Sequence, residues 1–327
     1  MDIFTHTLTG LALARAGAGR AAPYGTLALV VAANIPDVDY AYALGGPLSY
    51  LARRGTWSHS LLGAAGLAAG VALLFWLLVR SRRPAPHLLR NLLLVCQLGA
   101  FSHWALDGAS ASGIQLLYPF SETFYALDWL PAVDLWLVAL QLLGLLLPIL
   151  FRLISEEIGA RRSESGVRWG AGLALAACVL LVAGRGALHN DAKAQLDSRL
   201  YRGRTPLRVA AFPTPLSPLQ WHGIVETEST YETVEISFLG VQRGGGATRT
   251  YYKPEDSATL KAALTTRTAT VFMARARFPH LMVIPQPQGW QVRIQDIQYA
   301  SDASGLRRPI AWIELDESNQ VLSEGLR

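Results

Sequence analysis

Three long apolar runs constrain what this chain of 327 residues can fold into. They cover residues 61–79, 132–154 and 169–188, and each is close to the roughly 20 residues that an α-helix needs to cross the hydrocarbon core of a bilayer. Only 16% of the residues are charged, against about 25% in soluble domains. The sequence therefore predicts a polytopic α-helical membrane domain.

Three further apolar runs are weaker signals for membrane spans. The run at 88–106 is long enough, but it carries polar side chains near its end. The runs at 3–14 and 26–35 are too short to span on their own. For these two we expect tilted spans or a re-entrant helical pair.

Arginines between the runs predict an orientation. They are concentrated at 15–20, 80–90 and 152–168, and the positive-inside rule places all three segments in the cytoplasm. The segments at 37–58 and 107–131 then face outward, as does the chain after residue 188. The net charge of +5 is modest. Because the arginines lie beside apolar runs, the charge fits membrane orientation better than nucleic-acid binding.

The chain changes character after residue 188. Several segments combine β-branched and aromatic residues between Gly, Pro and Asp turns, which is typical of strands. They are 231–241, 268–278, 280–286, 289–300 and 310–317. We therefore expect two domains: a transmembrane helical domain over 1–188 and an extracytoplasmic, mostly antiparallel β (α+β) domain over 189–327.

Ionisable side chains gather at the predicted outer ends of the apolar runs. An ionisable group inside a membrane is expensive to bury and is by default a candidate functional group. The arginine-based orientation does not use these residues, yet it places all of them on the outer side. They are His6, Asp37, Asp39, His59, His103 and Asp107.

The spacing of these residues suggests how some of them meet. His103 and Asp107 are four apart and share one helix face, so both can point at one ion, although an intrahelical hydrogen bond is an equal alternative. Asp37 and Asp39 follow a proline that interrupts the preceding helix. One of them could bind a metal while the other orients a histidine, or both could stabilise the start of a helix.

The two remaining histidines also have structural alternatives. Ser58 is a candidate cap for the helix predicted over 61–79, which would leave His59 in its exposed first turn. His6 could be an interfacial histidine. Their place on the same side as the three aspartates favours a shared site.

Three histidines and three aspartates make a nitrogen- and oxygen-rich ligand set without a thiolate. Such a set suits a divalent metal, most simply Zn²⁺, with Mn²⁺ or Fe as alternatives. Six candidate ligands are enough for one or two ions. A bound metal makes hydroxide available near neutral pH, and paired ions stabilise the oxygens of a phosphoester. Because the sequence contains no Ser-centred nucleophile elbow and no Walker-type loop, metal-assisted hydrolysis is the reaction class we expect.

Several segments, spread over nearly the whole chain, resemble one known family. They are FTHTLTGLALARAG, NIPDVDY, RRGTWSHSLLG, SHWALDGASASGIQLLYPFSETFYALDWLPAVD, FPTPLSPLQWHGIVETESTYE and GWQVRIQDIQYA. They resemble the YdjM-like, LexA-regulated, membrane-bound metal-dependent hydrolases of bacterial inner membranes. The order of the R-G-x-x-H-S and H-x-x-x-D elements is specific, whereas either element alone is weak.

The resemblance implies a multi-pass inner membrane protein of the SOS response with phosphoester chemistry. It also implies a metal site made of the six residues named above. The substrate is not implied, and neither is the oligomeric state. We expect membrane lipids as partners, a phospholipid-like substrate and a periplasmic C-terminal domain. No nucleic-acid partner is expected.

The sequence suggests catalytic roles for three residues. Asp37 or Asp39 would act as general base or as orienter. Arg54, just before GTWSHS, would neutralise a phosphate, unless it is only a basic interfacial residue. The aromatic segment at 113–130 could form a lid or an acyl-chain groove, or an interfacial aromatic belt.

Three other functions compete with a phosphoester hydrolase. A membrane metalloprotease is one, although the sequence lacks H-E-x-x-H. A non-catalytic envelope or stress-response protein with a structural metal is another. A transporter would distribute polar residues through the depth of the bilayer, whereas here they gather at one side.

Overall fold

The computed structural model describes residues 1–327 except 83–85, 158–164, 240–248 and 300–308. The chain divides into two compact units. The membrane unit comprises Met1–Asp39 and Gly55–Ala187, and the C-terminal unit comprises Tyr40–Arg54 and Leu188–Arg327. The sequence does not indicate that Tyr40–Arg54 belongs with the C-terminal residues.

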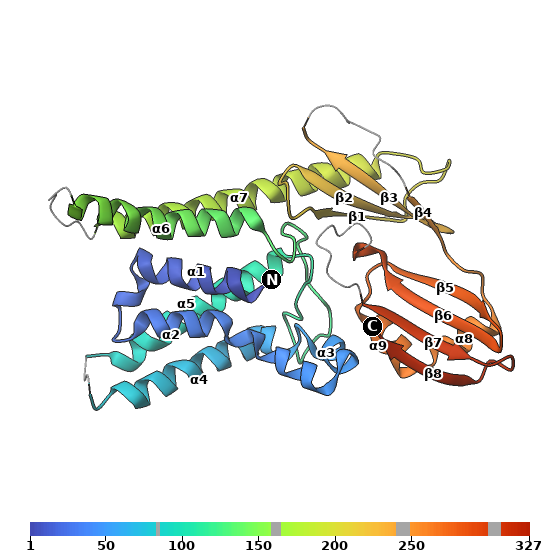
Figure 1. The fold of residues 1–327 in the computed structure, drawn as a ribbon, viewed down its shortest axis with the longest axis horizontal. Helices are drawn as coiled ribbons and strands as arrows, with labels where there is room; N and C mark the ends of the chain where they lie inside the picture. Colours follow the sequence, from blue (N-terminus) through green and yellow to red (C-terminus); the bar gives the residue numbers. More distant parts are fainter. Residues whose placement is uncertain (83–85, 158–164, 240–248, 300–308) are drawn as a thin grey trace. The chain divides into compact units, whose positions relative to one another are not determined.

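The membrane unit is a bundle of helices that lie side by side (Figure 1). Helix α5 packs against α2 and α4, and α1 packs against α2 and α6. At Gly99 a side chain would meet the backbone of Leu29 at 2.7 Å, so glycine lets α5 approach α2 closely. The helices that begin in this unit are α1 Ile3–Ala16, η1 Ala18–Arg20, α2 Gly25–Asn34, η2 Ile35–Gly45, η3 Trp57–His59, α4 Leu61–Val79, α5 Leu88–Ala109, α6 Leu135–Glu157 and α7 Ser165–Asp197.

Among the described residues, three helical segments are long and apolar enough to cross a membrane: Gly25–Gly45, Leu61–Val79 and Arg168–Asp197. The second and third correspond to predicted long runs. The first does not, because Pro36 interrupts the apolar pattern while the chain continues as a 3₁₀-helix. The predicted span at 132–154 contains a shorter apolar helix, Leu135–Phe151.

The helix ends sort into two sets (Figure 1). The α1–α2 turn, the end of α4, the start of α5, the end of α6 and the start of α7 lie at one end of the bundle. Two contacts support this arrangement: Asn91 donates a hydrogen bond to the carbonyl of Ala21, and the Arg168 guanidinium lies beside Gly17. The helix ends next to the arginine-rich segments used for the orientation therefore lie at one end of the bundle, and the start of α4 and the α5–α6 connection lie at the other.

The α5–α6 connection is held against the bundle by backbone hydrogen bonds. The amide of Gln115 donates to the carbonyl of Gly55 at 2.9 Å, and the amide of Leu61 donates to the carbonyl of Leu116 at 3.1 Å. The connection also pairs with itself through Ile114. It therefore fixes the backbone that enters α4.

The C-terminal unit contains two four-stranded antiparallel sheets, in the orders β1-β2-β3-β4 and β5-β6-β7-β8. This confirms the predicted antiparallel β structure of the C-terminal region. The strands are β1 Arg208–Pro213, β2 Gln220–Glu226, β3 Thr230–Ser237, β4 Arg249–Tyr252, β5 Pro279–Gln286, β6 Gly289–Asp296, β7 Ile310–Leu315 and β8 Val321–Leu326. The helical elements are α3 Pro47–Arg53, α8 Ala258–Leu264, α9 Arg267–Arg275 and η4 Ile297–Tyr299.

The expected strand at 268–278 is wrong, because most of it forms α9. Thr266 caps this helix by accepting a hydrogen bond from the amide of Ala269. Thr268, Ala269 and Phe272 are buried, and the spacing of Ala269 and Phe272 is helical rather than alternating. Phe272 packs into the core of the sheet formed by β5–β8.

Candidate metal centre

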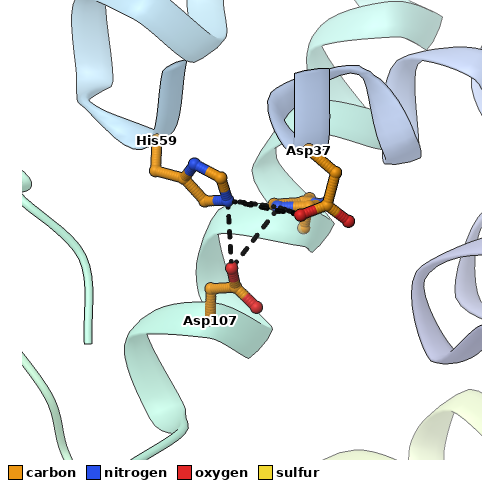
Figure 2. Close-up of side chains that lie close together, drawn as sticks. Asp37, His59 and Asp107 are labelled. Carbon is orange, nitrogen blue, oxygen red and sulfur yellow. Dashed lines mark hydrogen bonds and ion pairs between the residues drawn. The ribbon is translucent and has the colours of Figure 1, made fainter. Parts of the chain in front are cut away.

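Three segments far apart in the sequence bring ionisable side chains together at one end of the membrane unit. Asp37 follows α2 on the 3₁₀-helix η2, and His59 ends η3 just before α4. His103 and Asp107 lie one turn apart in the last two turns of α5. Figure 2 shows Asp37, His59 and Asp107 converging from their separate elements.

One ligand atom from each of these four residues lies within 4.8 Å of the other three. We call Asp37, His59, His103 and Asp107 the four-residue cluster. Nε2 of His59 lies 3.2 Å from Nε2 of His103, 3.2 Å from Oδ2 of Asp107 and 3.6 Å from Oδ1 of Asp37. Nε2 of His103 lies 3.5 Å from Oδ2 of Asp107 and 4.0 Å from Oδ1 of Asp37.

These separations fit the donor set of a small divalent metal. With metal–ligand bonds of about 2.0–2.2 Å, neighbouring ligand atoms of a tetrahedral site lie about 3.3–3.6 Å apart. Four of the five separations between 3.2 and 4.0 Å fall within about 0.1 Å of that range. Two imidazoles and two carboxylates are also ligands that Zn²⁺, Mn²⁺ and Fe accept. The buried cluster can thus bind a metal ion.

Each of the two histidines makes a further contact through Nδ1, on the side of the ring away from the cluster. Nδ1 of His103 lies 2.8 Å from the carbonyl of Ala33, so it donates there and leaves Nε2 as the free ligand atom. Nδ1 of His59 lies 3.3 Å from Oδ2 of Asp39 and 3.0 Å from Oγ of Ser58. Such outer contacts fix the ring and the tautomer of a metal-binding histidine.

The charges of the cluster favour a cation. Burial lowers the pKa of His59, but hydrogen bonds with Asp107, Asp37 and Asp39 outweigh it and raise the pKa to about 11. Without a metal, the carboxylates therefore hold a proton on this imidazole. A metal takes the place of that proton, because only neutral imidazole is a ligand.

His6 lies beside the four-residue cluster. Its ring stacks on His103 with centroids 3.7 Å apart, and its Nε2 lies 3.2 Å from Oδ1 of Asp107. The α-amino group of Met1 contacts the same oxygen. Asp107 therefore presents one oxygen to His59 and His103 and the other to His6.

The six predicted metal residues thus have different positions. Four form the cluster, His6 borders it, and Asp39 lies behind His59. Arg54 belongs to the C-terminal unit, where its guanidinium lies over the ring of Tyr50. The contact of this guanidinium with a phosphate stays a prediction.

Replacing Asp39 with asparagine separates an orienting role from a ligand role. Asparagine retains an oxygen for the amide of Gly55, which donates to Oδ2 of Asp39 at 2.7 Å, but it loses the charge beside His59. We expect metal affinity to fall by about tenfold, at the lower end of the range for outer partners of metal-binding histidines, whereas loss of a direct ligand lowers it on the order of 10²-fold. Competition titration of the purified protein with a chelating dye measures this. A loss as large as that for Asp107→Asn would instead make Asp39 a direct ligand.

Arg185 on α7 was not predicted as a site residue, and it is buried at 1% exposure. Its Nη2 lies 3.0 Å from Oδ2 of Asp134, and Oδ1 of Asp134 accepts hydrogen bonds from the amides of Trp136 and Leu137 at the start of α6. The available signal was an arginine inside the apolar run at 169–188.

Comparison with known proteins finds a family match for the helical part of the chain. A family model described as YdjM inner membrane protein matches residues 1–190. No curated protein matches the chain, and no solved structure matches it either. The match includes every residue of the cluster, and the chain after residue 190 lies outside it.

Proposed function

The chain belongs to the YdjM inner membrane protein family, and we propose that it is a metal-dependent hydrolase of phosphoesters. The proposed substrate is borne by a lipid or lies close to the membrane. We propose that the chain crosses the membrane several times. The cluster and the C-terminal unit would lie on the periplasmic side. The family and the apolar helices support an inner membrane protein.

The convergence of the four-residue cluster carries this proposal. Of its members, Asp37 is partly exposed, while His59, His103 and Asp107 are buried. A structural metal site is normally closed, whereas a catalytic site retains an open position. In this proposal a substrate approaches the cluster from the side of Asp37, the one member that is not buried as a whole residue.

The residues of this chain have distinct proposed roles. His59, His103 and Asp107 would hold the metal, and His6 would orient Asp107 through its second oxygen. Among the described residues, Oδ2 of Asp37 has no hydrogen-bond partner, so this oxygen can accept the proton of an attacking water. When bound, a divalent metal lowers the pKa of its water and polarises a phosphoryl oxygen.

Exposed apolar side chains on the α5–α6 connection support a lipid-borne substrate. Leu117, Phe120 and Leu127 are 42%, 84% and 48% exposed. The same connection is hydrogen-bonded to Gly55 and Leu61 beside His59. An acyl chain would therefore meet apolar surface near the proposed site.

Metal content and turnover test the proposal together. We expect the detergent-purified protein to contain one or two divalent ions by elemental mass spectrometry. We also expect it to release a phosphorylated headgroup from micelles of phosphatidylglycerol and phosphatidylethanolamine. Chelation should abolish release and added zinc should restore it. His87→Ala, at an exposed histidine outside the cluster, should behave like the parent.

The alternatives give different results. A folded parent that stays metal-free after reconstitution contradicts the metal site. Bound metal without phosphoester turnover supports the non-catalytic envelope protein. Metal-dependent cleavage of a casein probe without lipid turnover supports the metalloprotease.

A further inference from the structure

The segment Tyr40–Arg54 leaves the membrane unit and belongs to the C-terminal unit. We call it the excursion. The residues that flank it, Asp39 and Gly55, belong to the membrane unit and are joined by a hydrogen bond from the Gly55 amide to Oδ2 of Asp39 at 2.7 Å. The excursion therefore starts and ends next to the residue that orients His59.

The body of the excursion is packed into the C-terminal unit. Helix α3, Pro47–Arg53, contacts α9 and β8. Leu51 packs against the buried core that contains Phe272 and Ile313. Nη2 of Arg275, at the end of α9, donates a hydrogen bond to the carbonyl of Arg54 at 2.8 Å.

The carbonyl of Arg54 and the amide of Gly55 belong to one peptide group. Arg275 holds the carbonyl side of this group, and Asp39 accepts from its amide side. Hydrogen bonds on both sides of a peptide polarise one another, and the planar peptide transmits a displacement of one side to the other. Gly55 has a φ of +68°, a conformation that favours glycine, so the backbone geometry here is specific.

From this arrangement, and resting on the proposed function, we infer that the C-terminal unit positions the metal site. Arg275 and Leu51 are the positioning residues. They act through the Arg54–Gly55 peptide on Asp39, whose Oδ2 lies 3.3 Å from Nδ1 of His59. The chain after residue 190, which the family model does not match, thereby has a role in the chemistry of the helical part.

Arg275→Met in the full chain tests this inference. Methionine retains most of the apolar stem but removes the donor to Arg54. We expect hydrogen exchange at the Gly55 amide to become about tenfold faster and metal affinity to fall about tenfold. Peptide-resolved exchange mass spectrometry and competition titration measure the two effects. A role confined to the stability of the C-terminal unit would leave metal affinity unchanged.

Three further variants sharpen the test. Arg275→Lys keeps a donor and should recover most of the parental exchange and affinity. Arg267→Met changes an exposed arginine of the same helix and should match the parent. Leu51→Val removes one methylene from the contact of α3 with the C-terminal core. It should also speed exchange at the Gly55 amide and lower metal affinity. It therefore tests the inference even if Arg275→Met fails to fold.

The failures of the two ideas are distinguishable. A metal-free parent contradicts the proposed function, and exchange at Gly55 then decides the positioning inference alone. Unchanged exchange in folded Arg275→Met overturns the inference. Unchanged metal affinity in a metal-binding, folded Arg275→Met protein overturns it as well.

Discussion

Replacing Asp107 with asparagine is expected to remove most of the affinity of this protein for metal. Oδ2 of Asp107 lies within 3.5 Å of Nε2 of both His59 and His103, and Oδ1 lies 3.2 Å from Nε2 of His6. Asparagine has nearly the same shape but no charge, so it is a much weaker ligand. If one of four ligands carries about a quarter of the roughly 10–16 kcal/mol of zinc binding, the loss is about 3 kcal/mol, or on the order of 10²-fold.

Competition titration and elemental mass spectrometry measure this loss. Asp128→Asn is a matched control, because Asp128 is a buried aspartate of the membrane unit outside the cluster. Its φ of +59° suits asparagine as well as aspartate. We expect the control to retain parental affinity. Parental affinity in folded Asp107→Asn would contradict the site described above.

The location of the cluster could be predicted from the sequence because its signals are local. Apolar runs and flanking arginines place His59, His103 and Asp107 at one end of a bundle. The four-residue spacing of His103 and Asp107 puts them on one helix face. The structure agrees with both expectations.

The separate roles of Asp37 and Asp39 could not be predicted, because they depend on backbone geometry. The two aspartates are two residues apart in an apolar context, and the sequence leaves either one as the ligand. The 3₁₀-helix directs Asp37 toward Nε2 of His59 and Asp39 toward its Nδ1. A hydrogen bond from Gly55, 16 residues further along the chain, fixes this difference.

The packing of the excursion into the C-terminal unit and the helical structure of α9 could not be predicted for a related reason. The apolar residues of α3 read as part of an outer loop, because the sheet that they pack against lies more than 200 residues further along the chain. Residues 268–278 are rich in β-branched and aromatic side chains, which favour a strand. The cap at Thr266 and the burial of one helix face nevertheless stabilise a helix over most of this segment. Tertiary contacts override local propensity in both places.

The buried pair of Arg185 and Asp134 predicts the largest effect on stability. Both side chains are almost fully buried, at 1% and 0% exposure. Arg185 lies on α7, and Asp134 immediately precedes α6. Arg185→Met leaves the Asp134 carboxylate buried without its partner. Such a change costs about 3–5 kcal/mol, which corresponds to a fall in the unfolding midpoint on the order of 10 °C.

The double variant Arg185→Met with Asp134→Asn separates charge from packing. Asparagine can still accept the amide hydrogen bonds of Trp136 and Leu137, so the start of α6 keeps its cap. With both charges removed, no ion is left buried alone, and we expect the double variant to unfold well above the single variant in detergent. Arg168→Met, at an exposed arginine of the same helix, should unfold like the parent. If the double variant were as unstable as Arg185→Met, packing of the arginine stem rather than the ion pair would join α7 to α6.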